Sequence, residues 1–312
     1  MGYLMIAIAQ LAAAFKGIFA KRTSESVSKI PHAVLASLLR MTMATLLGAV
    51  WILLFQTVED FAAGRVIVLL AAAAGVFMGI NLVTWLLAVR EGSYLLVEIF
   101  ALLSVLFPLL GSRFLFDDRI LPLQWGGFAV LLLAVWILCA GKGTQRKKLT
   151  LKSIVLAALN SVFYGGVALA QKIFANLSER GTVTDSTAVF NLYSYVFSVF
   201  VLGICALFLA RRQGGDDRAV SGETGQLMRR ILPYLFVMAL GTILYYFFVV
   251  QAARYLSPIE LYPLNQGASL IISSFMSAVI FREGFTWKTG AGVVLALCGL
   301  FIINVLPMLL AG

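Results

Sequence analysis

Ten long apolar stretches follow one another along this chain, and only short polar segments separate them. A helix needs about 20 apolar residues to cross the hydrocarbon core of a bilayer. Hydrophobic residues make up 61% of the 312 residues and charged residues only 12%, about half the charge of an average soluble domain. The sequence therefore predicts an all-α, polytopic membrane protein. Its ten predicted transmembrane helices are Tyr3–Ala20, His32–Phe55, Val66–Val89, Ser93–Phe116, Leu121–Ala140, Leu151–Ala175, Ser186–Ala210, Ile231–Ala253, Leu256–Phe281 and Thr286–Leu310.

The basic residues gather in alternate connections between these stretches. The first, third, fifth, seventh and ninth connections together carry 16 lysines and arginines, and the other four carry 6. Because cytoplasmic loops are enriched in Lys and Arg, this bias predicts that the odd connections face the cytoplasm and that both termini lie outside. Anionic lipid headgroups, rather than a nucleic-acid partner, then explain the net charge of +10.

The most basic connection, residues 142–152, follows the fifth predicted helix. A unit of five helices is odd in number, so a second copy of it must enter the membrane in the opposite sense. We therefore predict two inverted five-helix repeats, at residues 1–141 and 153–312, joined by the loop 142–152. A shift of 164 residues aligns Ala88 with Ala252, Arg90 with Arg254, Ser93 with Ser257 and Gly126 with Gly290.

Three local patterns are shared with a known family. They are an aromatic-x-Gly in the first helix of each predicted repeat, an arginine in the second helix, and a Ser-Pro, Arg-Glu and Lys-Thr-Gly series near the end of the chain. The residues are Phe15-Lys16-Gly17, Phe163-Tyr164-Gly165, Leu39-Arg40-Met41, Ser257-Pro258, Arg282-Glu283 and Lys288-Thr289-Gly290. In these features the chain resembles the drug/metabolite transporter superfamily, in particular its ten-helix EamA-like metabolite transporters. The resemblance implies two five-helix units and a transport function. Relatives commonly have both termini inside, which differs from the charge-based prediction.

Two carboxylates, Glu98 and Glu260, lie inside predicted helices. A charge at a helix centre costs about 2.5–3.5 kcal/mol on insertion scales, so such residues usually face a cavity or a partner. We expect them to bind a cationic group or to exchange protons on opposite sides of a central cavity. Salt bridges to Arg90 and Arg254 are the structural alternative.

Lys16 and Arg40 are the two basic residues that we expect to be buried inside the predicted helices. Lys16 lies near a helix end, from which a long side chain can reach the headgroups. Arg40 lies deeper, and a structural ion pair with Glu98 or Glu260 is the favoured interpretation. The alternative is that both cations bind an anionic substrate.

The ninth predicted helix holds Tyr262, Pro263, Asn265, Gln266 and Gly267 in one short stretch. Proline removes a backbone N–H and clashes with the preceding turn, so Pro263 predicts a kink. Glycine allows a close approach of backbone or substrate. With Glu260, the tyrosine and the two amides form the predicted binding site, and Pro263 and Gly267 form the predicted hinge.

Three further residues are candidates for the same site. Asn81 is an amide inside a predicted helix, where such groups hydrogen-bond other helices or a ligand. Trp85 and Tyr164 are aromatic residues that favour a cationic group over the ring face. A carboxylate beside aromatic rings therefore suits an amine or a zwitterion.

The motifs exclude several classes of function. The chain has no GxxxxGK[ST] loop for ATP, one histidine, and neither an HExxH nor a GxSxG motif, so we predict a transporter and not an enzyme. We expect a secondary transporter of an amino acid, amine or similar metabolite that works by alternating access, with protons as the candidate coupling ion. An anion exchanger for sugar phosphates or nucleotides and a lipid flippase are the alternatives. We expect no cofactor or metal, a monomer or homodimer, and a bacterial cytoplasmic membrane.

Overall fold

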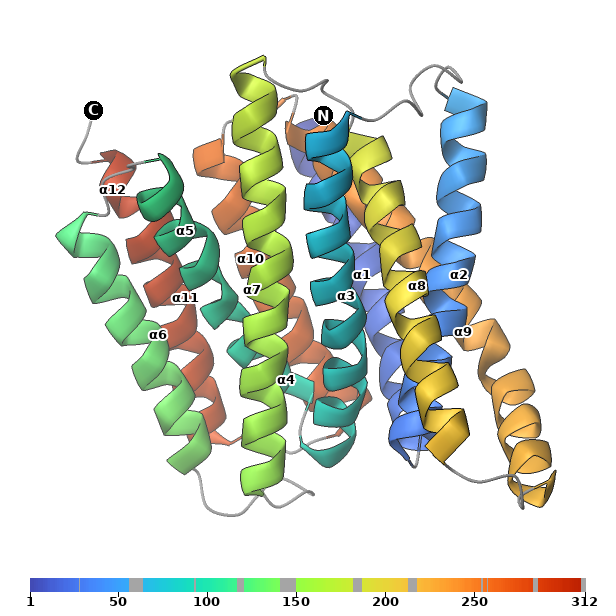
Figure 1. Ribbon diagram of the computed structural model, residues 1–312. Coiled ribbons are helices and arrows are strands. Elements are labelled where there is room, and N and C mark those ends of the chain that lie inside the picture. The colour runs from blue at the N-terminus through green and yellow to red at the C-terminus, as the bar shows by residue number, and fades with distance from the viewer. Residues whose placement is uncertain are drawn as a thin grey trace.

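The computed structural model describes residues 1–27, 29–55, 64–92, 94–116, 121–140, 150–181, 187–212, 218–253, 255–256, 258–282 and 286–309. The described residues form a bundle of helices without strands (Figure 1), which confirms the all-α prediction. The elements are α1 (Gly2–Ser26), α2 (Ile30–Phe55), α3 (Arg65–Glu91), α4 (Tyr94–Leu102), η2 (Leu103–Val105), α5 (Leu106–Phe116), α6 (Pro122–Ala140), α7 (Leu151–Glu179), α8 (Thr187–Arg212), α9 (Arg218–Ala253), α10 (Pro258–Phe275), η3 (Met276–Ile280), α11 (Trp287–Asn304) and α12 (Leu306–Leu309).

Six described helices are long and apolar enough to cross a membrane: α1, α2, α3, α7, α8 and α9. Shorter apolar helices lie at Pro122–Ile137, Leu264–Ile280 and Trp287–Ile303. The fourth predicted span consists of α4 and α5 joined by the 3₁₀ turn η2, and the ninth ends in the π-helical turn η3. Such irregular turns inside helices often mark functional positions.

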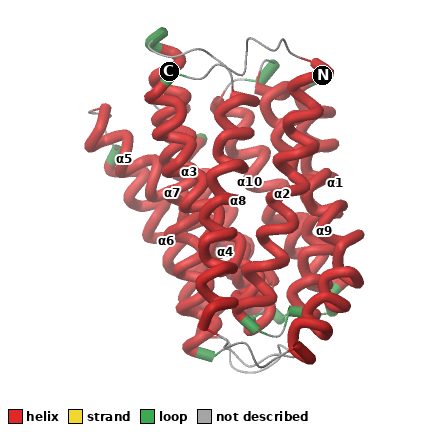
Figure 2. The backbone as a smooth tube through the Cα atoms, turned by 45° about the vertical axis from the view of Figure 1, so that its right-hand side comes forward, coloured by secondary structure: helices red, strands yellow, loops and turns green. Residues whose placement is uncertain are grey.

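The long helices pack in pairs that link the two halves of the chain. In this arrangement α1 lies against α9, α7 lies against α3, and α6 lies against α11. The first half thus contributes one member to each pair and the second half the other. Figure 1 shows α1 and α7 running in opposite directions, and Figure 2 shows the helices roughly side by side along one bundle axis.

One end of the bundle is closed by an apolar cluster. Its residues come from the end of α1, the start of α2, the end of α3 and the first half of α9, and they are Ala20, Val27, Ala33, Ala36, Leu86, Met228, Ile231, Leu235 and Met238. All of them are at most 6% exposed. These four segments meet at the same end and form one buried apolar contact there, which we call the closing cluster.

Helices α6 and α11 approach closely through glycine. A Cβ built on Gly127 would lie 3.0 Å from the carbonyl oxygen of Gly299 and 2.6 Å from the side chain of Ile303. A Cβ on the neighbouring Gly126 would meet no atom within 4 Å. Small residues allow helix backbones to come together in a membrane, and here only one of the two glycines has that role.

We expect Gly127→Ala to destabilise the protein by about 1–3 kcal/mol, because the added methyl group overpacks the α6–α11 contact. Gly126→Ala is the matched control and should be neutral or slightly stabilising, since alanine favours helix by up to about 1 kcal/mol over glycine. Thermal unfolding of the purified variants in detergent measures both. Equal midpoints for the two variants would contradict this account of the packing.

Candidate functional site

A cavity of about 190 Å³ lies in the interior of the bundle. Helices α1, α2, α3, α4, α7, α9 and α10, with the turn η3, each contribute residues to its wall. The polar lining residues are Gln10, Lys16, Arg40, Asn81, Trp85, Tyr94, Glu98, Asn160, Tyr164, Thr242, Tyr245, Tyr246, Ser269 and Ser273. The cavity therefore brings Lys16, Arg40 and Glu98 together with amides, hydroxyls and aromatic rings from both halves of the chain.

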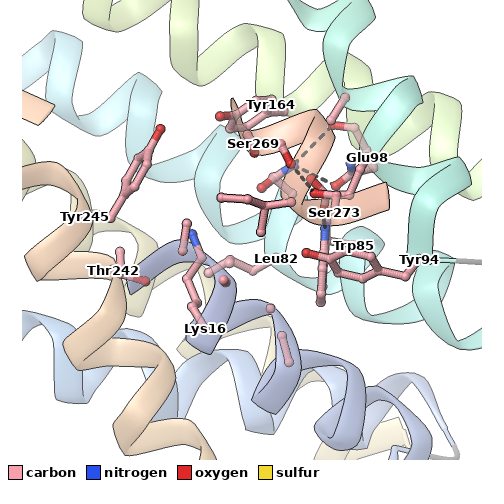
Figure 3. Close-up of a pocket in the computed structure, with 18 of the residues that line it drawn as sticks. Lys16, Leu82, Trp85, Tyr94, Glu98, Tyr164, Thr242, Tyr245, Ser269 and Ser273 are labelled. Carbon is pink, nitrogen blue, oxygen red and sulfur yellow. Dashed lines mark hydrogen bonds between the residues drawn. The ribbon is translucent and has the colours of Figure 1, made fainter. Parts of the chain in front are cut away.

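Glu98, on α4, is the acidic group of the cavity. Its Oε1 accepts a hydrogen bond of 3.3 Å from the indole Nε1 of Trp85 on α3, and the hydroxyl of Tyr94 donates a second hydrogen bond to it. Tyr94 lies four residues before Glu98, so the two side chains share one face of α4. Donors from α3 and α4 thus hold the carboxylate at the cavity, and Figure 3 shows Glu98 with Trp85 and Tyr94 nearby.

Lys16, on α1, is a basic group in the middle of the lining. Its ammonium nitrogen lies 5.2 Å from the ring centroid of Tyr245, within the range of a cation–π contact. In the part of the chain that the structure describes, no carboxylate forms an ion pair with Lys16. Figure 3 shows Lys16 between Thr242 and Tyr245 on one side and Glu98 with Trp85 on the other.

Arg40, on α2, is 8% exposed and lies against α9. Its Nη2 donates a hydrogen bond of 3.0 Å to the hydroxyl of Thr242, which itself donates to the carbonyl of Met238 at 2.8 Å. The Nε of Arg40 is buried and has no hydrogen-bond partner in the described structure. A buried donor without a partner costs about 1–3 kcal/mol, so Arg40 has hydrogen-bonding capacity left for a ligand.

Two amide networks connect helices around the cavity. Asn81 on α3 donates from Nδ2 to the carbonyl oxygen (3.1 Å) and to Oδ1 (2.8 Å) of Asn160 on α7. Gln10 on α1 donates in the same way to Asn265 on α10, at 3.0 Å and 2.7 Å, and Asn265 donates to the hydroxyl of Tyr245 at 2.8 Å. The Oε1 of Gln10 and the Nδ2 of Asn160 remain buried without a partner among the described residues.

The structure brings six of the candidate residues into the cavity wall: Lys16, Arg40, Asn81, Trp85, Glu98 and Tyr164. Asn265 lies behind the wall and acts through Gln10 and Tyr245. Gln266 does not line the cavity, and its Oε1 is buried without a described partner. A Cβ on Gly267 would meet only Leu297 of α11, at 3.7 Å.

Glu260, Tyr262 and Pro263 belong to the backbone of α10, but their side chains lie outside the described residues. Their proposed roles, and the hinge at Pro263 and Gly267, stay predictions.

One expectation for the charged residues needs correction, because Lys16 lines the interior cavity and does not extend to the headgroups. Arg40 bonds a hydroxyl of α9 and forms no ion pair with Glu98. An ion pair between Arg40 and Glu260 stays a prediction, because the side chain of Glu260 lies outside the described residues.

The site residues predicted from the sequence did not include several polar residues of the lining, namely Gln10, Tyr94, Asn160, Thr242, Tyr245, Tyr246, Ser269 and Ser273. Gln10 carried the same signal as the amides that were chosen, because it is an amide inside an apolar stretch. Thr242 and the serines carried little signal, since hydroxyl groups inside membrane helices commonly bond the backbone of their own helix. Ser273, for example, donates to the carbonyl oxygen of Ser269 at 2.7 Å.

The second half of the chain matches a known family. Residues 151–305 belong to the EamA-like transporter family. Members of this family move small metabolites across membranes, and it is not a family of enzymes. With the six long apolar helices, the match makes the chain an integral membrane transporter.

The fold is shared with proteins of known structure. One solved crystal structure is 16% identical in sequence to this chain and has a TM-score of 0.59. The match covers 100% of this chain and 99% of the chain in that structure. At this identity the match shows a common fold over the full length of both chains. None of the curated proteins compared with this chain matches it.

The cavity predicts which positions on α1 water can reach. Ala13 lines the cavity, whereas Ala9, one turn earlier, is 0% exposed. With the native cysteines replaced by serine, we expect a water-soluble thiol reagent to label Ala13→Cys in purified protein and to leave Ala9→Cys unlabelled. Mass spectrometry of the labelled protein measures this. Equal labelling of both positions would contradict the cavity.

Proposed function

We propose that this protein is a secondary transporter that carries a small zwitterionic metabolite, such as an amino acid, through the central cavity by alternating access. The observation that carries the proposal is the separation of charge inside the cavity. Lys16, and Arg40 through its hydrogen bond to Thr242, offer positive charge on the side of α9, and Glu98 on α4 offers negative charge on the other side. A solute with a carboxylate and an amine can satisfy both.

The basic side suits a carboxylate. Arg40 keeps a buried Nε without a described partner, and Lys16 forms no ion pair with a described carboxylate. Hydrogen bonds between charged partners contribute about 1.5–3 kcal/mol each, more than neutral ones. A substrate carboxylate would give these two cations the partner that the described protein does not provide.

The acidic side suits an amine. Glu98 accepts two hydrogen bonds, from Trp85 and Tyr94, and a carboxylate has about four lone-pair sites. An ammonium group can use the remaining sites while it lies near the indole ring. Glu98 is also the one carboxylate among the described lining residues, which makes it the candidate proton site if transport is coupled to protons.

Alternating access requires two halves that can move, and the packing of the helices supports such a division at residues 1–141 and 153–312. The contact of α1 with α9 has a counterpart in the contact of α7 with α3, and each joins the first helix of one half to the third helix of the other. Helices α2 and α8, the second helices of the two halves, lie against each other. This exchange of partners is what two inverted repeats would produce.

An anionic substrate is the second candidate. The described lining contains two cations and one carboxylate, so a phosphorylated or dicarboxylic solute would also find opposite charge. It would leave Glu98 facing like charge, which is why we favour the zwitterion. Glu260 remains a candidate for a second carboxylate of the protein that binds the substrate.

A matched set of ligands tests the proposal. An amino acid is compared with the amine obtained by removing its carboxylate and with the acid obtained by removing its amine, for example leucine, 3-methylbutylamine and 4-methylpentanoate. We expect the amino acid to bind most tightly. Glu98→Gln should weaken the binding of the amino acid and the amine by about 10- to 100-fold. Lys16→Gln should weaken the binding of the amino acid and the acid by a similar factor.

Binding is measured calorimetrically, and flux is measured in reconstituted vesicles. Both measurements use the leucine set and the corresponding sets of amino acid, amine and acid for the other amino acids. Preference for the acid in every set would favour the anion exchanger. The same flux assay on Glu260→Gln tests the role of that residue. If Glu98→Gln and Lys16→Gln left all members unchanged, the cavity would not be the substrate site.

The orientation in the membrane is tested separately. Because the segment 142–152 is the most basic connection, we expect it to face the cytoplasm. In a cysteine-free background, Thr144→Cys should resist a membrane-impermeant maleimide in intact cells and react in inverted vesicles. Labelling in intact cells would reverse the predicted orientation.

A further inference from the structure

We propose that Tyr94, held in place against the backbone of Gly17, is a positioning residue that fixes the Glu98 carboxylate for the amine of the substrate. This inference rests on the proposed function and adds a residue pair that orients its acidic group. The observations come from three helices, α1, α3 and α4, and from the turn η3.

Tyr94 is a well-anchored residue at the start of α4. It is 5% exposed, and its ring lies edge-on to Trp85 at 6.0 Å and to Phe281 at 5.1 Å between centroids. Aromatic pairs of this geometry are favourable beyond the area that they bury. The ring therefore has little freedom, and the hydroxyl that bonds Glu98 is delivered from a fixed position.

Gly17 provides the space for this hydroxyl. A Cβ built on Gly17 would lie 2.6 Å from the Oη of Tyr94, while the ring carbon Cζ would be 3.4 Å away and the methyl group of Met276 3.1 Å away. The hydroxyl oxygen thus occupies the place where any other residue would put its side chain. The side chain of Tyr94 reaches the backbone of α1 at this point, and glycine leaves room for its hydroxyl.

The two donors on Glu98 have a common consequence. Trp85 donates from α3 and Tyr94 from α4, so two separate helices hold the carboxylate. A carboxylate held in this way needs no reorganisation when an amine binds, which favours affinity. Loss of the tyrosine hydroxyl should therefore weaken the binding of ligands that carry an amine and leave the binding of ligands without an amine unchanged.

The contact between Tyr94 and Gly17 is tested without any ligand. Gly17→Ala should lower the thermal unfolding midpoint in detergent by several degrees, because its methyl group collides with the hydroxyl. Tyr94→Phe removes that oxygen, so the double variant should unfold at a higher temperature than Gly17→Ala alone. Gly203→Ala is the control, since a Cβ there meets no atom within 4 Å. A double variant no more stable than Gly17→Ala would overturn this part.

The role at Glu98 is tested with leucine, 3-methylbutylamine and 4-methylpentanoate. Tyr94→Phe should weaken binding of the first two by about tenfold and leave 4-methylpentanoate unchanged. The matched control is Tyr195→Phe, because Tyr195 is buried on α8 outside the cavity wall. An equal loss for all three ligands, or no loss, would overturn the positioning role.

A failure of the proposed substrate can be told apart from a failure of this inference. If wild-type protein bound none of the three probes or the other amino-acid sets, the substrate class would be wrong. The link between Tyr94 and Glu98 would then be decided by unfolding midpoints of Tyr94→Phe, Glu98→Gln and the double variant. Non-additive shifts support the hydrogen bond as the link, and additive shifts overturn it.

Discussion

Charged groups inside a bundle that hydrocarbon surrounds constrain every other part of this structure. A charge facing lipid at the centre of a helix costs about 2.5–3.5 kcal/mol on insertion scales, so Lys16, Arg40 and Glu98 must turn inward. Once they do, the interior cannot be packed dry without leaving them unpaired. Seven helices contribute residues to the polar cavity in which these three charged groups lie.

Apolar packing complements that cavity and makes its two ends different. The closing cluster lies at the end where α1 finishes and α2 begins. A second apolar cluster joins the start of α3, the end of α7 and the start of α8, through residues such as Ile67, Phe174 and Phe190. Both clusters are buried, but they differ in extent, since the closing cluster joins four helices and the second cluster joins three.

The positions of the helices could be predicted because a long apolar stretch is a property of the sequence alone. All ten predicted spans correspond to helical segments. The errors lie at the ends and inside two spans. Helix α9 begins at Arg218 rather than Ile231, since a helix can continue into water where apolar residues are not needed. The turns η2 and η3 interrupt the fourth and ninth spans through tertiary packing, which hydropathy does not record.

The site could be predicted only as far as each residue carries its own signal. Glu98, Trp85 and Asn81 were found because polar or aromatic groups inside a membrane helix are conspicuous. Which of them face the cavity depends on rotation about the helix, and successive residues differ by about 100°, as the 3.6-residue turn requires. Asn265 and Gln266 illustrate this, because the first joins a network at the cavity and the second does not.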